Sequence, residues 1–207
     1  MSRVLSVKQI INFPVNSNCF VVNYASSGEC FLVDPACGTG ETLVEYLTGQ
    51  GLTPSCIMLT HEHFDHISSV EYLRNYYTCK VIASDVCSNA IGNAKKNLSL
   101  FNDQVGFTCK PADILIEKRK VDLNWNEFMI QFHLTPGHSA GGMCFSIENN
   151  LFTGDTLMNA YKPVIKLPGG DKVKLNESIN RLRNLYNEST AVFPGHGEPF
   201  LLEDIKI

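Results

Sequence analysis

The chain has 207 residues, of which 44% are hydrophobic and 18% are charged, and its formal net charge is −4 at pH 7. This length suits one globular domain, so we predict a single domain over residues 1–207. The acidic balance argues against nucleic acid as a partner, because polynucleotide binding depends on basic residues. The N-terminus lacks the apolar segment of a signal peptide and no later run of 18 apolar residues occurs, so we expect a cytoplasmic protein that acts on a small molecule and does not bind membranes.

The first third of the chain is predicted to consist of strands. Short β-favouring runs, separated by turns rich in Asn, Ser and Gly, occupy residues 4–13, 19–24 and 30–33. We expect these strands to form an antiparallel meander. A helix follows, with Thr39 as its N-cap and with Gly49 and Gly51 at its end. Residues 55–60 are almost continuously apolar, which indicates a strand buried on both faces.

The middle of the chain changes from a regular pattern to an irregular one. Apolar residues recur every three or four positions from Asp65 to Tyr77, which predicts one helix, and a strand is expected at residues 80–83. Residues 85–112 contain several Gly and Asn residues and no clear period. Two interpretations stay open for this segment, a lid over an active site or a surface excursion.

The second half is also predicted to run from strands to a helix. Its predicted strands are residues 113–116, 121–123, 128–134, 143–147, 151–153 and 191–193. A helix with apolar residues at helical spacing from Leu175 to Tyr186 precedes the last of them. Two such halves predict an α/β (α+β) fold, in which two sheets pack face to face with helices outside.

The eight cysteines do not indicate a disulfide framework, since no CxxC pair occurs and several cysteines lie in apolar runs. We expect most of them to be small buried hydrophobic residues. Cys37 lies in the loop after a predicted strand. It is either an ordinary loop thiol, which we favour, or a residue near the functional site.

The strongest chemical signal is an HxHxDH motif that directly follows a buried strand. It reads His61-Glu62-His63-Phe64-Asp65-His66. In an extended backbone His61 and His63 project to the same side, as two ligands of one ion must, whereas the helix that begins there turns Asp65 and His66 elsewhere. Four donors within six residues favour two metal ions over one.

Further donors occur where later predicted strands end in glycine. They are His138 in TPGHS, Asp155 in TGDT and His196 in PGHG. Glycine lets the backbone turn sharply and approach a metal closely. Each residue alone has a simpler interpretation, as a turn residue or, for Asp65, a helix N-cap. Together they predict a metal site, and we interpret His133, the sixth histidine, as a strand residue outside it, with a supporting contact to the ligands as the alternative.

These motifs, in this order, resemble the metallo-β-lactamase superfamily and are most similar to its glyoxalase II (hydroxyacylglutathione hydrolase) branch, over residues 18–199. The resemblance implies a four-layered αβ/βα sandwich of two mixed sheets with the metals at one edge. It also implies that His61, His63 and His138 hold the first metal. Asp65, His66 and His196 then hold the second metal, and Asp155 bridges the two.

The expected activity is dinuclear, metal-dependent hydrolysis of a small thioester by a metal-bound hydroxide, with Asp65 and Asp155 as catalytic carboxylates. We expect two divalent ions, Zn²⁺ by default, with iron or manganese as alternatives. Tyr161, Lys162 and Lys166 are candidates for substrate binding, and a solvated loop face is the alternative. The basic C-terminal region through which glyoxalase II binds glutathione has no counterpart after His196, so we expect weak binding of that moiety.

Several other functions remain open. A lactonase or other ester hydrolase uses almost the same centre, and a persulfide dioxygenase uses one iron held by two histidines and one aspartate. A nuclease is disfavoured by the acidic charge, and a non-enzymatic descendant by the presence of all seven donors. Antibiotic hydrolysis is not the expected main role, because the commonest subclass of true β-lactamases has cysteine at the position of Asp155.

Overall fold

The computed structural model describes residues 4–24, 27–36, 38, 40–126, 128–159 and 161–205. These residues form two six-stranded sheets, in the orders β1-β2-β3-β4-β5-β6 and β12-β11-β10-β9-β8-β7. Each sheet has both parallel and antiparallel neighbours. The strands of the first sheet are β1 (Leu5–Asn12), β2 (Ser17–Tyr24), β3 (Glu29–Val33), β4 (Thr53–Met58), β5 (Lys80–Ser84) and β6 (Ile114–Ile116). Those of the second are β7 (Lys120–Trp125), β8 (Phe128–Leu134), β9 (Met143–Ile147), β10 (Asn150–Gly154), β11 (Ala191–Pro194) and β12 (Phe200–Leu201).

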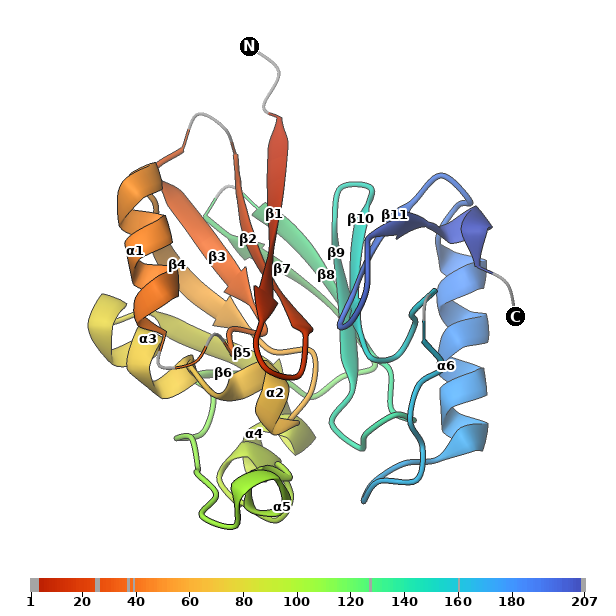
Figure 1. Cartoon of the computed structure of the whole chain (residues 1–207). Helices are drawn as coiled ribbons and strands as arrows, with labels where there is room; N and C mark the ends of the chain where they lie inside the picture. Colours follow the sequence, from red (N-terminus) through yellow and green to blue (C-terminus); the bar gives the residue numbers. More distant parts are fainter. Residues whose placement is uncertain are drawn as a thin grey trace.

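Helices cover the outer faces of both sheets, which gives the four layers that the resemblance implies (Figure 1). The helical segments are α1 (Glu41–Gln50), α2 (Phe64–Ile67), α3 (Val70–Tyr77), α4 (Asp85–Ile91), α5 (Ser99–Asp103), α6 (Lys172–Leu185) and a 3₁₀ turn at Leu202–Asp204. Figure 1 shows α1 and α3 on one flank of the molecule and α6 on the opposite flank. Among the described residues, no helix is long and apolar enough to cross a membrane.

The alternation of side chains along the strands builds separate cores. In β2, Cys19 and Val21 pack with the helices that cover the first sheet, whereas Phe20 and Val22 pack between the sheets. This is the period of two that a strand buried on both faces requires. The inter-sheet core is rich in phenylalanine, including Phe152, whose ring stacks on that of Phe145 at 5.1 Å between centroids. Burying a side chain of this size stabilises the fold by about 1.5–3 kcal/mol, so this core fixes the two sheets against each other.

The assignment of residues 113–116 to the second half was wrong, because β6 belongs to the first sheet. It pairs in parallel with β5, with Ile82 opposite Ile114. The Asp113 carboxylate accepts hydrogen bonds from the Val81 amide at 2.8 Å and from Arg74 at 2.7 Å. These contacts attach the short strand to the edge of the first sheet.

The single helix predicted between Asp65 and Tyr77 is also a correction, since two helices, α2 and α3, occupy this segment. The helix is interrupted at Ser68 and Ser69 because these residues donate hydrogen bonds to the loop after β3. The Ser69 amide donates to the Pro35 carbonyl at 3.2 Å, and Ser68 Oγ donates to the Ala36 carbonyl at 3.1 Å. The amide of Ser69 is therefore not available to a continuous helix.

Two expectations about helix ends need amendment. Gly40 is the N-cap of α1, and the predicted cap, Thr39, lies outside the described residues. Gly51 is the C-cap, with a φ of 65°, as expected, whereas Gly49 lies inside the helix.

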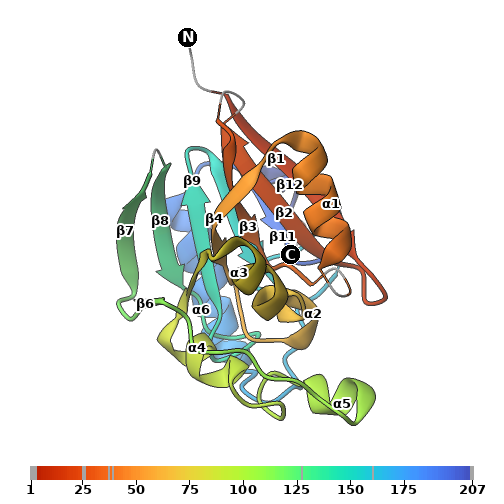
Figure 2. The ribbon, with the colours of Figure 1, turned by 90° about the vertical axis from the view of Figure 1, so that its left-hand side faces the viewer.

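Residues 85–112 do not behave as one segment, because their first part is a helix of the core and their later part contacts the loop with the HxHxDH motif. The first seven form α4, whose N-cap Ser84 accepts a hydrogen bond from the Cys87 amide, and Cys87 and Ile91 belong to the core under the first sheet. The later part reaches the loop with the HxHxDH motif, because the Phe64 amide donates to the Asn97 carbonyl at 2.8 Å. Figure 2 shows both α4 and α5 at the lower end of the molecule, below the strands.

The cysteines that the structure describes are buried, as predicted. They are Cys19, Cys30, Cys56, Cys79, Cys87, Cys109 and Cys144. Cys37 lies outside the described residues, so its interpretation stays a prediction.

Candidate metal centre

The fold brings together all seven donors that the motifs predict. They come from the segment after β4 (His61, His63), from α2 (Asp65, His66) and from the loops after β8 (His138), β10 (Asp155) and β11 (His196). Donor atoms within 4.8 Å of one another form three groups, which are His61 with His63 and His138, Asp65 with His66 and His196, and Asp34 with His61 and His66. The first two groups match the ligand sets that the resemblance implies.

Asp155 lies between the two groups. Its Oδ2 is 3.5 Å from His138 Nε2 and 3.7 Å from His196 Nε2, and its Oδ1 is 3.6 Å from His66 Nε2. Two ligand atoms on one tetrahedral zinc ion lie roughly 3.4 Å apart, given metal–ligand distances of about 2.1 Å. The spacing around Asp155 is therefore close to that of ligands that share an ion.

Hydrogen bonds on the outer sides of the rings set the tautomers of two histidines. His138 Nδ1 lies 2.8 Å from the Val164 carbonyl, and His196 Nδ1 lies 3.1 Å from the Asn16 carbonyl. Because a carbonyl only accepts, both Nδ1 atoms must carry the proton. In the neutral ring, Nε2 then presents its lone pair to the centre, as a metal ligand requires.

Asp34 sets two more rings and is the residue that the sequence reasoning missed. Its Oδ2 lies 3.0 Å from His66 Nδ1 and accepts the Thr60 hydroxyl proton at 2.5 Å. Because the Thr60 hydroxyl donates its only proton to Asp34, its Oγ1 accepts a hydrogen bond from His61 Nδ1, 3.0 Å away. The only sequence signal was the place of Asp34 directly after a strand, the position that the other donors share.

Unpartnered buried atoms support a bound cation. His61 Nε2, His66 Nε2 and Asp155 Oδ1 are buried and have no hydrogen-bond partner among the described residues. An unsatisfied buried polar atom costs about 1–3 kcal/mol, so three in one cluster would be an unusual loss. His63 also directs Nδ1 to within 3.0 Å of His138 Nε2. Mixed imidazole and carboxylate donors in this arrangement fit divalent ions such as zinc or iron.

Burial and mutual repulsion keep most of the imidazoles ready to bind a cation. Burial above all, with His138 and His66 adding to it, lowers the pKa of His63 to about 3. Burial likewise lowers the pKa of His61 and of His138. These rings are therefore neutral near pH 7, the form that binds metal.

His66 is different because carboxylates surround it. Burial disfavours its charged form, but Asp65, Asp34 and Asp155 together outweigh burial and raise the pKa of His66 to about 10. Burial likewise opposes the ionisation of Asp65, yet His66 and the hydrogen bond with His196 hold the pKa of Asp65 well below its usual range. In the metal-free protein, His66 is thus a cation among carboxylates near pH 7.

Glu62, between the first two histidines, ties the two halves of the centre together. Its buried carboxylate accepts from Ser139 Oγ at 3.0 Å and from the Gly141 amide at 3.4 Å. Ser139 and Gly141 follow His138, so Glu62 joins the segment after β4 to the loop after β8. Burial raises the pKa of Glu62 above its usual value.

A glycine next to His196 leaves room for two of the donors. A Cβ at Gly195 would lie 2.1 Å from Asp155 Oδ1 and 2.9 Å from His66 Cε1. Such distances are far below van der Waals contact, so any larger residue must displace Asp155 or His66. This is the close approach that the PGHG motif predicts.

The remaining candidates lie at different distances from the centre. The Tyr161 and His196 rings are 6.4 Å apart between centroids. Lys162 and Lys166 are exposed on the same loop, on either side of the Val164 carbonyl that contacts His138. His133 is a strand residue, as predicted, and bonds to the Tyr186 hydroxyl at 2.7 Å.

Comparison with known proteins places this chain in a family. It belongs to the metallo-β-lactamase superfamily, whose model matches residues 12–196. The probable metallo-hydrolase YqgX of Bacillus subtilis is 34% identical over 166 residues, which are 79% of this chain and 78% of that protein. The BLEG-1 B3 metallo-β-lactamase structure is similar with a TM-score of 0.89 and 31% identity, covering 96% of this chain and 95% of that one. TTHA1623 in a di-iron-bound form has a TM-score of 0.80 and 26% identity, covering 95% and 96%.

The clearance at Gly195 generates a first prediction. Gly195→Ala should weaken metal binding by about tenfold or more, because the new Cβ displaces groups that orient the centre. Competition with a chelator measures this affinity. Gly49→Ala is the matched control, because a Cβ there meets nothing within 4 Å. Equal metal affinity in the Gly195→Ala and Gly49→Ala variants would contradict the close approach of Gly195 to Asp155 and His66.

A second prediction follows from the charge on His66. A metal bound at Nε2 must displace the proton that the raised pKa retains near pH 7.5, and this release should disappear as the pH rises through about 10. Calorimetric zinc titrations in buffers of different ionisation enthalpy count the protons released. His66→Gln should release about one proton fewer than the unaltered chain. An unchanged count would show that His66 is neutral before metal binds.

Proposed function

We propose that this protein is a dinuclear metal-dependent hydrolase that cleaves a small thioester, as in the glyoxalase II branch that its motifs resemble. The observation that carries the proposal is the position of Asp155, 3.5–3.7 Å from donors of both groups. His61, His63 and His138 would hold one ion, Asp65, His66 and His196 the other, and Asp155 would bridge them. Zinc is the metal we propose, with iron as the alternative that the di-iron form of TTHA1623 supports.

The chain's own residues divide the work of the reaction. When bound, two divalent ions would lower the pKa of water toward neutrality and polarise a carbonyl oxygen. Asp155 lies within reach of both donor groups and Asp65 within reach of His66 and His196, and in this proposal these two carboxylates accept the proton of the attacking water. The outer hydrogen bonds keep the imidazoles in one orientation while charge develops on the substrate. No serine or cysteine nucleophile is required.

The loop after β10 is the proposed contact for the leaving group. Its Tyr161 ring faces the His196 ring edge-on, and Lys162 and Lys166 carry exposed positive charges beside the centre. Lysine ammonium groups there would attract a carboxylate on the thiol part of the substrate. We further propose that the substrate is a small molecule in the cytoplasm rather than a nucleic acid or a membrane lipid.

A second candidate function is β-lactam hydrolysis. It is supported by the 31% identity to a chain described as a B3 metallo-β-lactamase over almost its full length. The reaction needs the same chemistry, attack of activated water on a carbonyl, and differs in the shape of the substrate.

A panel of substrates tests the proposed function. The zinc-loaded protein is assayed with lactoylglutathione, a neutral acyl thioester, a lactone, a β-lactam and, in the iron-loaded form, a persulfide. We expect kcat/KM for a thioester to exceed that for the lactone and the β-lactam by tenfold or more. If a lactone, a β-lactam or a persulfide is the better substrate, the proposal of a thioester is wrong although the metal centre remains.

The role of the lysines gives a separate prediction. Lys162→Ala or Lys166→Ala should raise KM for lactoylglutathione about fivefold and leave a neutral thioester nearly unchanged, because only the first carries carboxylates. Lys118→Ala is the control, since Lys118 is exposed and lies outside this loop. An equal change in KM for both thioesters would show that the lysines do not recognise the carboxylates of the substrate.

A further inference from the structure

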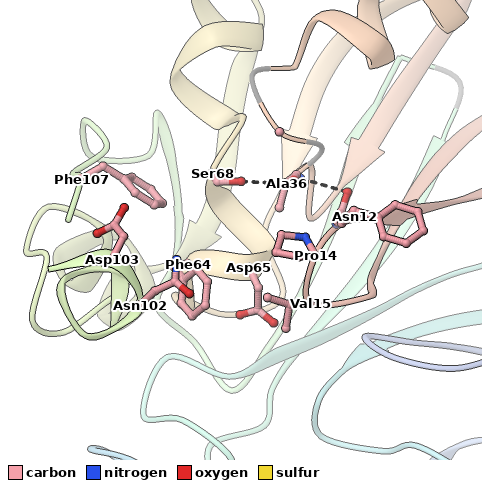
Figure 3. Close-up of a pocket in the computed structure, with 12 residues that line it drawn as sticks. Asn12, Pro14, Val15, Ala36, Phe64, Asp65, Ser68, Asn102, Asp103 and Phe107 are labelled. Carbon is pink, nitrogen blue, oxygen red and sulfur yellow. Dashed lines mark hydrogen bonds between the residues drawn. The ribbon is translucent and has the colours of Figure 1, made fainter. Parts of the chain in front are cut away.

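A pocket of about 380 Å³ opens beside Asp65, and the proposed chemistry gives no role to its other described lining residues. It lies between the hairpin that joins β1 to β2, helix α2 and the segment around α5 (Figure 3). Its volume falls within the range of small-ligand pockets. The loop of Tyr161, Lys162 and Lys166 contributes none of the described residues that line it.

Apolar side chains form opposing walls of this pocket. Phe13, Pro14 and Val15 come from the hairpin, and Phe64 and Phe107 come from the other elements. Figure 3 shows Phe107 on one side and Pro14 and Val15 on the other, with Phe64 between them. Phe13 is 73% exposed and Val15 is 40% exposed. Covering exposed apolar surface of this kind is favourable, so the walls are suited to an apolar occupant.

Two neutral polar side chains of the lining, those of Ser68 and Asn12, form hydrogen bonds within the chain. Ser68 Oγ donates to the Ala36 carbonyl at 3.1 Å, and Asn12 Oδ1 accepts from the Ala36 amide at 3.3 Å (Figure 3). The Asn12 amide group donates to Ser17 Oγ at 2.9 Å. These groups hold the hairpin against the loop after β3, so Ser68 and Asn12 have little capacity left for hydrogen bonds to a ligand.

The charges of the lining are acidic. Asp65 and Asp103 are its ionisable residues, and none of its described residues is a lysine or an arginine. Asp103 Oδ1 accepts from the amides of Gly106 at 2.8 Å and Val105 at 3.0 Å, and these hydrogen bonds lower the pKa of Asp103. The carboxylate therefore stays ionised near neutral pH and repels an anionic ligand.

We infer that this pocket takes the acyl group of the substrate and that this acyl group is uncharged and apolar. The inference rests on the proposed function, because the loop of Tyr161, Lys162 and Lys166 is proposed to hold the leaving group, and the pocket, which that loop does not line, adjoins Asp65. The two together define a substrate with an apolar acyl part and an anionic or polar thiol part.

A matched pair of thioesters tests the acyl specificity. Hexanoyl and adipoyl thioesters of N-acetylcysteamine have acyl chains of the same length, which end in a methyl group and in a carboxylate. The zinc-loaded chain should hydrolyse the hexanoyl thioester with a kcat/KM at least about tenfold higher. Phe13→Ala should lower kcat/KM for the hexanoyl thioester about fivefold with little change for the adipoyl one. Asp103→Asn keeps the oxygen that accepts hydrogen bonds from the amides of Val105 and Gly106 but removes the charge. It should reduce the ratio of kcat/KM for the hexanoyl thioester to that for the adipoyl thioester.

Two controls keep the result specific to the pocket. Phe101→Ala alters another phenylalanine, 68% exposed on α5, that does not line the pocket, and Asp122→Asn alters an exposed carboxylate of β7. Neither variant should change the ratio of kcat/KM for the hexanoyl thioester to that for the adipoyl thioester. Equal rates for the two thioesters, or equal effects of Phe13→Ala and Phe101→Ala, would overturn the inference while the proposed function stands.

Binding tests the pocket independently of activity. Hexanamide should shift the backbone amide resonances of Val15, Phe64 and Phe107, and adipic acid monoamide should shift them at least about tenfold more weakly at equal concentration. If neither thioester is hydrolysed but hexanamide binds there, the proposed function fails and the pocket remains. If hexanamide shifts none of these resonances, the inference itself is wrong.

Discussion

Hydrogen bonds on the outer sides of the imidazole rings decide where the lone pairs of this centre point. Asp34 accepts from both His66 and Thr60, and through Thr60 it also sets the tautomer of His61. Backbone carbonyls do the same for His138 and His196. With the outer nitrogens fixed as donors, the inner nitrogens face the donor groups, and those of His61 and His66 have no hydrogen-bond partner among the described residues. A buried cluster of this kind is stable only if a cation, or protons such as the one on His66, offsets its electrostatics.

The rest of the fold holds the residues that make these outer contacts in fixed relative positions. One donor group takes His61 and His63 from the first sheet and His138 from the second, so its geometry depends on how the sheets pack. The aromatic core between the sheets and the hydrogen bonds of Glu62 across the loops provide that constraint. Rigid strands supply the positions and short loops supply the ligands, the arrangement that gives a site its precision. In our proposal, the acidic pocket beside Asp65 and the basic loop of Tyr161 divide substrate recognition between them.

Local patterns were enough to predict the strands and the metal-binding motifs. β8 and β9 have the bounds that alternation and β-propensity predict, and the donors after β4, β8, β10 and β11 were identified by the glycines and polar residues that follow apolar runs. Contacts between distant segments could not be predicted in this way. The break between α2 and α3 depends on Pro35, the assignment of β6 to the first sheet depends on Asp113, and the role of Asp34 depends on a ring 32 residues away. No periodicity encodes such pairings, which arise only when the sheets are assembled.

The central claim is that the centre holds two metal ions that share Asp155. Elemental analysis of the purified, dialysed protein tests it most directly, with Asp155→Ala beside the unaltered chain and Asp122→Ala as a control on an exposed strand residue. The account predicts about two ions per chain in the unaltered protein and in Asp122→Ala, and about one in Asp155→Ala, because removing the shared carboxylate takes a ligand from both donor groups and the negative charge that offsets the repulsion between the two ions. A single ion in the unaltered protein, or two firmly held ions in Asp155→Ala, would contradict it.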